Sequence, residues 1–275
     1  MSAEGSFPFE GERIAYETHG SGDRVVVLIH GLLMNRRMFR RLAPVLASHG
    51  NRVICVDLLG HGDSSAPANV NRYSMAAFSS QVAALLDHLE VEQAVVGGTS
   101  LGANVSLELA VARPERVRAL FIEMPVLDSA LVATAIAFTP VLAASALGAP
   151  ILDVVARAAR QIPRTHHLID IGLDWVRRDP RSSALVLQGL LVGRTCPPKA
   201  EREAIAAQAL VVGHRSDPIH PFSDSDDLVA EMPNARLVDA DSIFEWRIKP
   251  GRLDRELCSF LDRVHPGTAK LASVA

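Results

Sequence analysis

The stretch Gly98-Thr99-Ser100-Leu101-Gly102 decides the fold, because it joins a short apolar run to a helical segment through a serine flanked by glycines. The preceding residues, Ala94-Val95-Val96, have the composition of a buried strand, and Leu101–Val111 has that of a helix. A glycine two residues to either side of the serine lets strand and helix pass closely at a sharp turn. Such a turn exposes the serine hydroxyl, which is the first requirement for a nucleophile.

Similar apolar runs recur along the chain, and each ends in a turn. Val25–Ile29 is followed by His30-Gly31, and Val53–Val56 is followed by Asp57. Segments of helical period lie between such runs, for example Ser74–Leu89, whose apolar residues share one face. This alternation predicts an α/β fold: a doubly wound, mostly parallel sheet covered by helices, with ligands bound beyond the carboxyl ends of the strands. The other strand-like runs are residues 94–96, 119–122, 209–212 and 235–238.

The alternation of strands and helices stops after Pro125 and resumes at Ala209. We interpret residues 126–193 as an inserted helical cap on a core formed by residues 1–125 and 194–275, which is long enough to bury a sizeable interior. Between Leu131 and Leu152 the residues are apolar on more than one face. Two interpretations stay open: these residues line a cavity for a hydrophobic small molecule, or they pack against the core or in a homodimer.

A nucleophilic serine also needs donors that stabilise negative charge on the attacked carbonyl. Leu101 follows the serine at the start of a helix, where the helix dipole favours negative charge at its backbone N–H. A second donor is expected in the loop after an earlier strand, where the sequence points to the N–H of Leu32. We therefore expect an oxyanion hole at Leu32 and Leu101. The residues expected to brace the surrounding loops are His30, Gly31, Gly98 and Gly102.

These motifs, taken in order, resemble the α/β-hydrolase superfamily over about Phe9 to Val264. The resemblance rests on His30-Gly31, on Asp57–Ser64 (Asp-x-x-Gly-His-Gly-x-Ser) and on the glycine-flanked serine. It implies a nucleophile at Ser100.

The resemblance also implies where the other site residues lie. Asp57 and His61 correspond to loop-bracing residues. Asp217, in the loop after residues 209–212, corresponds to the triad acid. Glu123, at the end of an earlier strand, is the alternative acid.

The base is the departure from this pattern. In the superfamily order of Ser, Asp or Glu, then His, the histidine is expected within Asp239–Trp246, and none occurs between His220 and His265. His220 is our working assignment for the base, on condition that it comes within about 2.6–3.2 Å of the serine oxygen. The pair His166-His167 in the cap is the alternative. Without a base, kcat would fall by about 10⁶.

Composition excludes several classes of partner. The formal charge of −3 and the pI near 6.4 give no field that attracts nucleic acid or anionic lipid. We find no phosphate-binding loop, metal-ligand cluster or cofactor motif, so we expect cofactor-free chemistry. The widely spaced cysteines, Cys55, Cys196 and Cys258, and an acidic first segment without a signal sequence favour a cytoplasmic protein.

One segment, Ala130–Leu152, has no ionisable side chain and is long enough to cross a bilayer. Pro140, Gly148 and Pro150 interrupt it, so we expect no membrane span.

Three hypotheses follow from the sequence. The leading one is a cofactor-independent hydrolase of an apolar ester, thioester or lactone, with Ser100 as nucleophile. The second is an elimination, cyclisation or C–C bond reaction in which the oxyanion hole holds an enolate. The third is a ligand-binding pseudoenzyme.

Overall fold

The computed structural model describes residues 2–164, 167–243 and 245–265. The strands are β1 (Ser2–Phe9), β2 (Glu12–His19), β3 (Val25–Ile29), β4 (Arg52–Asp57), β5 (Ala94–Thr99), β6 (Val117–Glu123), β7 (Gln208–His214) and β8 (Ala235–Ala240). The α-helices are α1 (Leu42–Ser48), α2 (Met75–His88), α3 (Leu101–Ala112), α4 (Ala130–Leu147), α5 (Ala149–Gln161), α6 (His167–Val176), α7 (Pro180–Val192), α8 (Lys199–Glu203), α9 (Phe222–Glu231), α10 (Glu245–Ile248) and α11 (Gly251–Val264). Short 3-10 turns are η1 (Arg36–Phe39), η2 (Val70–Arg72) and η3 (Pro114–Arg116).

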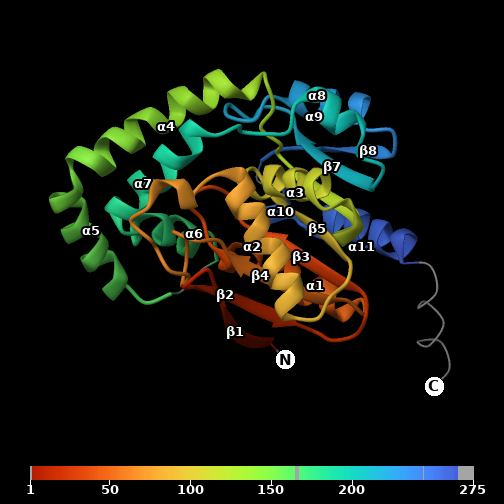
Figure 1. Cartoon of the computed structure of the whole chain (residues 1–275), viewed down its shortest axis with the longest axis horizontal. Helices are drawn as coiled ribbons and strands as arrows, with labels where there is room; N and C mark the ends of the chain where they lie inside the picture. The colour runs from red at the N-terminus through yellow and green to blue at the C-terminus, as the bar shows by residue number, and fades with distance from the viewer. Residues whose placement is uncertain (1, 165–166, 244, 266–275) are drawn as a thin grey trace.

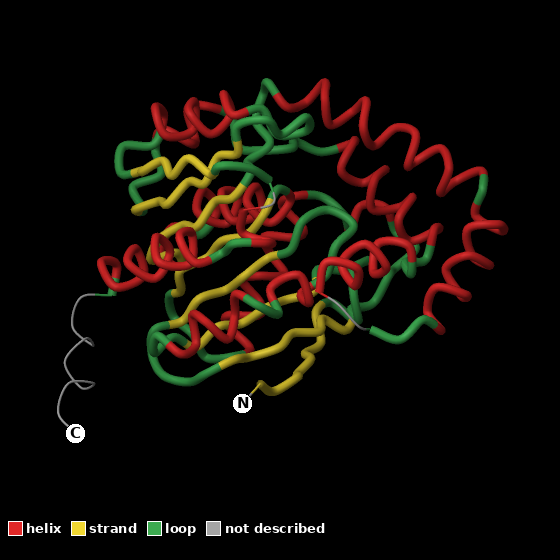
Figure 2. Tube along the Cα trace, turned by 180° about the vertical axis from the view of Figure 1, so that it is seen from behind, coloured by secondary structure: helices red, strands yellow, loops and turns green. Residues whose placement is uncertain are grey.

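The strands form one eight-stranded sheet in the order β1-β2-β4-β3-β5-β6-β7-β8. From β4 to β8 all neighbours are parallel, which confirms the predicted mostly parallel α/β fold (Figures 1 and 2). The antiparallel strands β1 and β2 at one edge were not predicted. Most side chains of β1 are exposed, so its sequence lacks the apolar run that marked the inner strands.

Alternate residues of the strands point to opposite faces of the sheet and so pack into two apolar cores, one on each face. In β3, Val25, Val27 and Ile29 enter the core under α2, α3 and α9. The intervening Val26 and Leu28 enter the core under α1 and α11. Helix α2 begins where the sequence predicted, because Ser74 caps it by accepting a 3.1 Å hydrogen bond from the N–H of Ala77.

Helices α4 to α7 lie between β6 and β7 in the chain and gather at one side of the molecule (Figure 1). Helix α4 packs against α7, and α4 and α5 form the outer arc of this group. Within the described residues, no single helix is long and apolar enough to span a membrane. The consecutive segments 133–147 and 149–161 reach that length and hydropathy only together, across a bend of 96°.

The turn from β5 into α3 is packed closely against β3. Ser100 lies at φ 54° and ψ −109°, a backbone conformation that side-chain-bearing residues rarely adopt. On each side of it a glycine meets the same obstacle: a Cβ added to Gly98 or to Gly102 would overlap the carbonyl oxygen of Ile29 in β3. The absence of both side chains therefore allows α3 to start directly beside the sheet.

We predict that Gly102→Ala lowers the free energy of unfolding by about 1–3 kcal/mol, because the added methyl group must displace backbone rather than a side chain. Gly172→Ala is the control. It lies in the exposed middle of α6 with nothing within 4 Å of an added Cβ, and should raise stability by up to about 1 kcal/mol. Urea unfolding of both variants checks this, and equal stabilities would contradict the proposed overlap.

Candidate active site

Ser100 is fixed by its backbone at the carboxyl end of β5. Its N–H donates a 2.8 Å hydrogen bond to the carbonyl oxygen of Glu123 at the end of β6, and its own carbonyl accepts from Asn104 at 3.1 Å. The side chain remains partly exposed. The turn thus holds the hydroxyl at the sheet edge where parallel α/β folds bind ligands.

Asp217 folds the loop after β7 around its own carboxylate. Its Oδ1 accepts hydrogen bonds from the backbone N–H groups of Ile219 (2.8 Å) and His220 (3.0 Å). Its Oδ2 lies 2.9 Å from Nδ1 of the His220 ring. A carboxylate can only accept, so Nδ1 carries the ring proton and Nε2 is left as an acceptor. This local turn brings a histidine ring back onto a carboxylate only three positions away.

His220 Nε2 lies 2.9 Å from Ser100 Oγ. The structure therefore brings Ser100, His220 and Asp217 into one hydrogen-bonded series, and the condition set for His220 by the sequence, about 2.6–3.2 Å, is met. Burial alone would raise the pKa of Asp217, but the hydrogen bond from the His220 ring and those from the N–H groups of His220 and Ile219 outweigh it and hold that pKa below its ordinary value. Asp217 is thus ionised at neutral pH.

A cavity of about 180 Å³ opens beside these groups, and Leu32 and Leu101 both line it. Leu101 is the first residue of α3, so its N–H has no acceptor within the helix. Helix α4 supplies one wall, and α7 supplies another. The lining residues from these two helices are Leu131, Thr134, Ala135, Phe138, Thr139, Leu142, Leu187, Leu190 and Leu191.

Two buried histidines support the loop that carries Leu32. His30 Nδ1 donates to the carbonyl of Gly31 at 2.9 Å, and its Nε2 accepts from the N–H of Leu58 at 3.1 Å. His61 Nε2 accepts from the N–H of Leu33, which is held at φ 58°. Burial lowers the pKa of His30 to about 4 and that of His61 well below its ordinary value. Both rings are therefore neutral, and their nitrogens are occupied by backbone groups.

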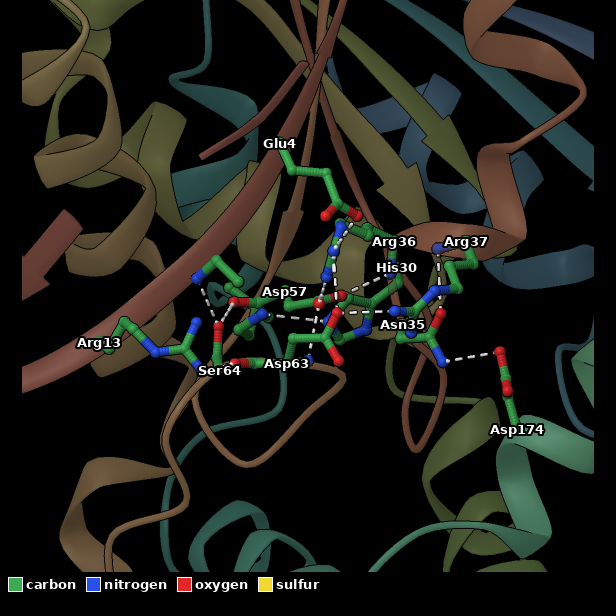
Figure 3. Close-up of polar contacts among 12 residues, drawn as sticks. Glu4, Arg13, His30, Asn35, Arg36, Arg37, Asp57, Asp63, Ser64 and Asp174 are labelled. Atoms are coloured by element: carbon green, nitrogen blue, oxygen red, sulfur yellow. Dashed lines mark hydrogen bonds and ion pairs between the residues drawn. The ribbon is translucent and has the colours of Figure 1, made fainter. Parts of the chain in front are cut away.

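A buried ion pair ties the same loop to the sheet (Figure 3). Asp57, at the end of β4, pairs with the guanidinium of Arg36 and accepts a 2.6 Å hydrogen bond from the Arg36 N–H. It also accepts from the N–H of Asp63 at 2.9 Å. On the other side of the loop, Asn35 Nδ2 donates to Asp174 of α6 at 3.2 Å, which links this network to the helices between β6 and β7.

Glu123, the alternative acid, makes other contacts. Its buried carboxylate accepts from Thr99 Oγ1, pairs with Arg247 and lies 3.3 Å from His214 Nε2. Burial alone would raise the pKa of Glu123, but the charge and hydrogen bonds of Arg247, together with the nearby ring of His214, hold it well below the ordinary range. Burial would lower the pKa of His214, yet the nearby carboxylate of Glu123 raises it.

The sequence did not predict that Arg247 and His214 contact Glu123. Neither residue has a sequence motif around it that indicates a partner at the end of β6. Arg247 comes from α10, directly after the segment in which a triad histidine was expected. Of the alternative bases, His166 lies outside the described residues, as does the side chain of His167.

Comparison with known proteins supports this architecture. A sequence profile described as alpha/beta hydrolase fold matches residues 24–242. The chain belongs to this family. It is 36% identical over 110 residues to "Bifunctional epoxide hydrolase 2" of Sus scrofa, covering 40% of this chain and 20% of that protein. The chain thus matches about a fifth of that relative's length.

A second relative is "2-hydroxymuconate semialdehyde hydrolase" of Pseudomonas sp. (strain CF600), which is 38% identical over 102 residues, or 37% of this chain and 32% of that protein. Among solved structures, a hydrolase from Pseudomonas aeruginosa PA01 has a TM-score of 0.75 and 24% identity over 94% of this chain and 98% of that one. The enol-lactonase from Burkholderia xenovorans LB400 has a TM-score of 0.75 and 20% identity, covering 94% and 99%. At these identities the two structures establish the shared fold.

We predict that Glu123 makes the protein sensitive to acid. A carboxylate whose pKa is lower in the folded than in the unfolded protein stabilises the fold above its ordinary pKa, about 4.3, and loses this contribution as pH falls. The free energy of unfolding should therefore fall progressively as the pH drops below about 5. In Glu123→Gln it should be lower by about 3–5 kcal/mol at pH 7, because Arg247 loses its partner, and should depend less on pH.

Glu92→Gln, at an exposed position, is the matched control and should keep the wild-type slope. Urea titrations at several pH values measure both quantities. An unchanged slope in Glu123→Gln would refute the assignment of the acid sensitivity to this carboxylate.

Proposed function

We propose that this protein is a cofactor-independent serine hydrolase of apolar carboxylic esters, thioesters or lactones. The observation that carries the proposal is the series from Asp217 Oδ2 to His220 Nδ1 and from His220 Nε2 to Ser100 Oγ, with both separations at 2.9 Å. A nucleophile, a base within reach of it and a third group that orients the base form the arrangement required for acyl transfer. This supports assigning the base to His220 and the acid to Asp217.

The proposed reaction uses these groups in turn. His220 Nε2 takes the hydroxyl proton as Ser100 Oγ bonds to the substrate carbonyl carbon, and the N–H groups of Leu32 and Leu101 stabilise the resulting oxyanion. The carbon–oxygen or carbon–sulfur bond then breaks, and the leaving group departs with the proton from His220. Water repeats the sequence on the acyl-enzyme, releasing the acid and the free serine. Asp217, kept ionised, stabilises the imidazolium formed in each half-reaction.

The cavity supports an apolar acyl group. Among the described residues that line it, His220 is the only one with an ionisable side chain, so nothing there neutralises a charged substrate. Its volume of about 180 Å³ suits a group of roughly six carbons, since an apolar cavity of about 150 Å³ holds benzene. We propose that residues 126–193 act as the cap that closes this cavity, because α4 and α7 form two of its walls. The similarity to an enol-lactonase fits this substrate class.

We predict that Ser100→Ala abolishes hydrolysis of p-nitrophenyl butanoate and hexanoate, and that His220→Ala lowers kcat by about 10⁶. The reason is that an isolated serine hydroxyl is a weak nucleophile without a base. A fluorophosphonate probe should label the wild type rapidly and neither variant. His49→Ala is the matched control, since His49 is exposed at the end of α1, and its turnover should be unchanged.

Two results would reject the proposal. Wild-type labelling no faster than that of Ser100→Ala would show an unactivated serine and favour a non-covalent reaction or a ligand-binding protein. Unchanged turnover in His220→Ala would remove His220 from the mechanism.

The two candidate acids are separated by a second pair of variants. We predict that Asp217→Asn lowers kcat by about 10⁴, because an amide no longer stabilises the imidazolium or fixes the ring tautomer. Glu123→Gln should retain kcat in its folded fraction, since the described contacts of Glu123 go to Thr99, Arg247 and His214 rather than to His220. Ester-hydrolysis assays on both variants, with folding checked by circular dichroism, measure the two kcat values. A larger loss of kcat in Glu123→Gln than in Asp217→Asn would make Glu123 the acid.

A further inference from the structure

The chain that enters and leaves the proposed cap is tied to one side chain of α3. Asn104 lies one helical turn after Ser100, whose carbonyl accepts the Asn104 N–H. The side-chain Nδ2 of Asn104 donates to the carbonyl oxygens of Val126 at 2.7 Å and of Thr195 at 2.8 Å, and its Oδ1 accepts from the N–H of Val126 at 3.1 Å. Val126 follows β6 and Thr195 follows α7. A single amide therefore joins both ends of the proposed cap to the helix that begins at Ser100.

The amide group of Asn104 matches the backbone groups that it contacts. The residue is fully buried, and its Nδ2 has two N–H bonds for two carbonyl oxygens. An aliphatic side chain at this position would leave one backbone N–H and two carbonyls without this partner, which is unfavourable away from water. An aspartate there would have no N–H to donate. The two ends are thus held by the hydrogen-bonding groups of the side chain, in addition to its volume.

A second buried side chain holds the start of α4. Asp224, in α9, accepts hydrogen bonds from the backbone N–H groups of Leu127 (2.6 Å), Ala130 (3.1 Å) and Ser129 (3.2 Å). Ser129 directly precedes the helix and makes no side-chain capping bond of its own. The Asp224 carboxylate therefore takes the place of the cap residue, at the end of the helix where the dipole favours negative charge.

These anchored segments form part of the wall of the Ser100 cavity. Asn104, Val126 and Thr195 border the cavity, and Leu131 begins the wall that α4 supplies. Anchoring the backbone at both ends of the proposed cap sets how far these walls lie from the serine. A close-packed cavity with walls held in this way discriminates between acyl chains, because a single methylene changes the fit.

We propose that Asn104 is a positioning residue that sets the acyl-chain selectivity of the proposed active site. It acts through the backbone of Val126 and Thr195, since its side-chain hydrogen bonds go to those groups and not to the reacting side chains. Asp224 supports it by holding the residues that follow Val126. The selectivity rests on the proposed function, whereas the anchoring itself does not.

The test compares kcat/KM for p-nitrophenyl butanoate, hexanoate and decanoate. The wild type should favour hexanoate, which fits the cavity, over decanoate. In Asn104→Ala the released walls should raise KM for hexanoate about tenfold with kcat little changed, and should reduce the hexanoate-to-decanoate ratio of kcat/KM at least about fivefold. Labelling by the fluorophosphonate probe should stay within about twofold of the wild type, because Ser100, His220 and Asp217 keep their contacts.

Ser106→Ala is the matched control. Ser106 is also buried in α3, but its hydroxyl donates to the carbonyl of Gly102 within the same helix. The variant loses a buried hydrogen bond without releasing the cap, so its chain-length profile should match the wild type. Asp224→Asn is the second test variant. It keeps the side-chain volume but replaces one acceptor oxygen by an N–H donor facing backbone N–H groups, and it should shift the profile in the same direction as Asn104→Ala.

Hydrogen–deuterium exchange measures the anchoring without turnover. The amides of residues 126–130 should exchange at least about tenfold faster in Asn104→Ala than in Ser106→Ala. Unchanged exchange would overturn the anchoring.

Two kinetic results would overturn the assigned selectivity. One is an unaltered chain-length profile in both Asn104→Ala and Asp224→Asn. The other is a loss of probe labelling in step with turnover, which would place the effect at Ser100 rather than at the cavity wall. A wild type that neither hydrolyses these esters nor reacts with the probe would refute the proposed function and the selectivity with it, whereas the exchange rates decide the anchoring separately.

Discussion

The carbonyl oxygen of Ile29 packs against both Gly98 and Gly102, and the rest of the site depends on this contact. It allows α3 to begin beside the sheet, which places Ser100 at φ 54° with its hydroxyl at the sheet edge. It also joins β3 to the turn, and β3 leads directly into the loop that carries Leu32. The relative positions of the serine and of the proposed oxyanion donors therefore follow from a backbone approach that only glycine permits.

Two buried charge clusters support this turn from different sides. Asp57 and Arg36 hold the loop between β3 and α1, close to the neutral rings of His30 and His61. Glu123 and Arg247 lie behind Ser100, where the backbone of Glu123 accepts the Ser100 N–H. Breaking such a pair leaves an uncompensated buried charge, so each cluster keeps its loop in one arrangement. The candidate active site thus lies between two loops that are fixed electrostatically.

The sequence predicted the inner strands and the turn at Ser100 because both depend on local signals: apolar runs, glycines and a helical period. It could not predict the Glu123–Arg247 pair, because the two residues are 124 positions apart and no sequence pattern near either one indicates the other as its partner. His220 shows a subtler limit. The sequence placed it near Asp217, but whether its ring reaches the serine depends on how the carboxylate folds the turn, through its bonds to the N–H groups of Ile219 and His220. The sequence did not predict strand β1, because its mostly exposed side chains form no apolar run.

The turn from Asp217 to His220 has a mechanical consequence. The proposed acid and base lie three positions apart in one turn that their own hydrogen bonds close, so their separation does not depend on the position of β8 or α11 relative to β7. Only one relation between separate parts of the chain must be maintained, that between this turn and Ser100. The segment after β8 therefore need not supply the proposed base. In this protein it carries Arg247, which pairs with Glu123 at the end of β6.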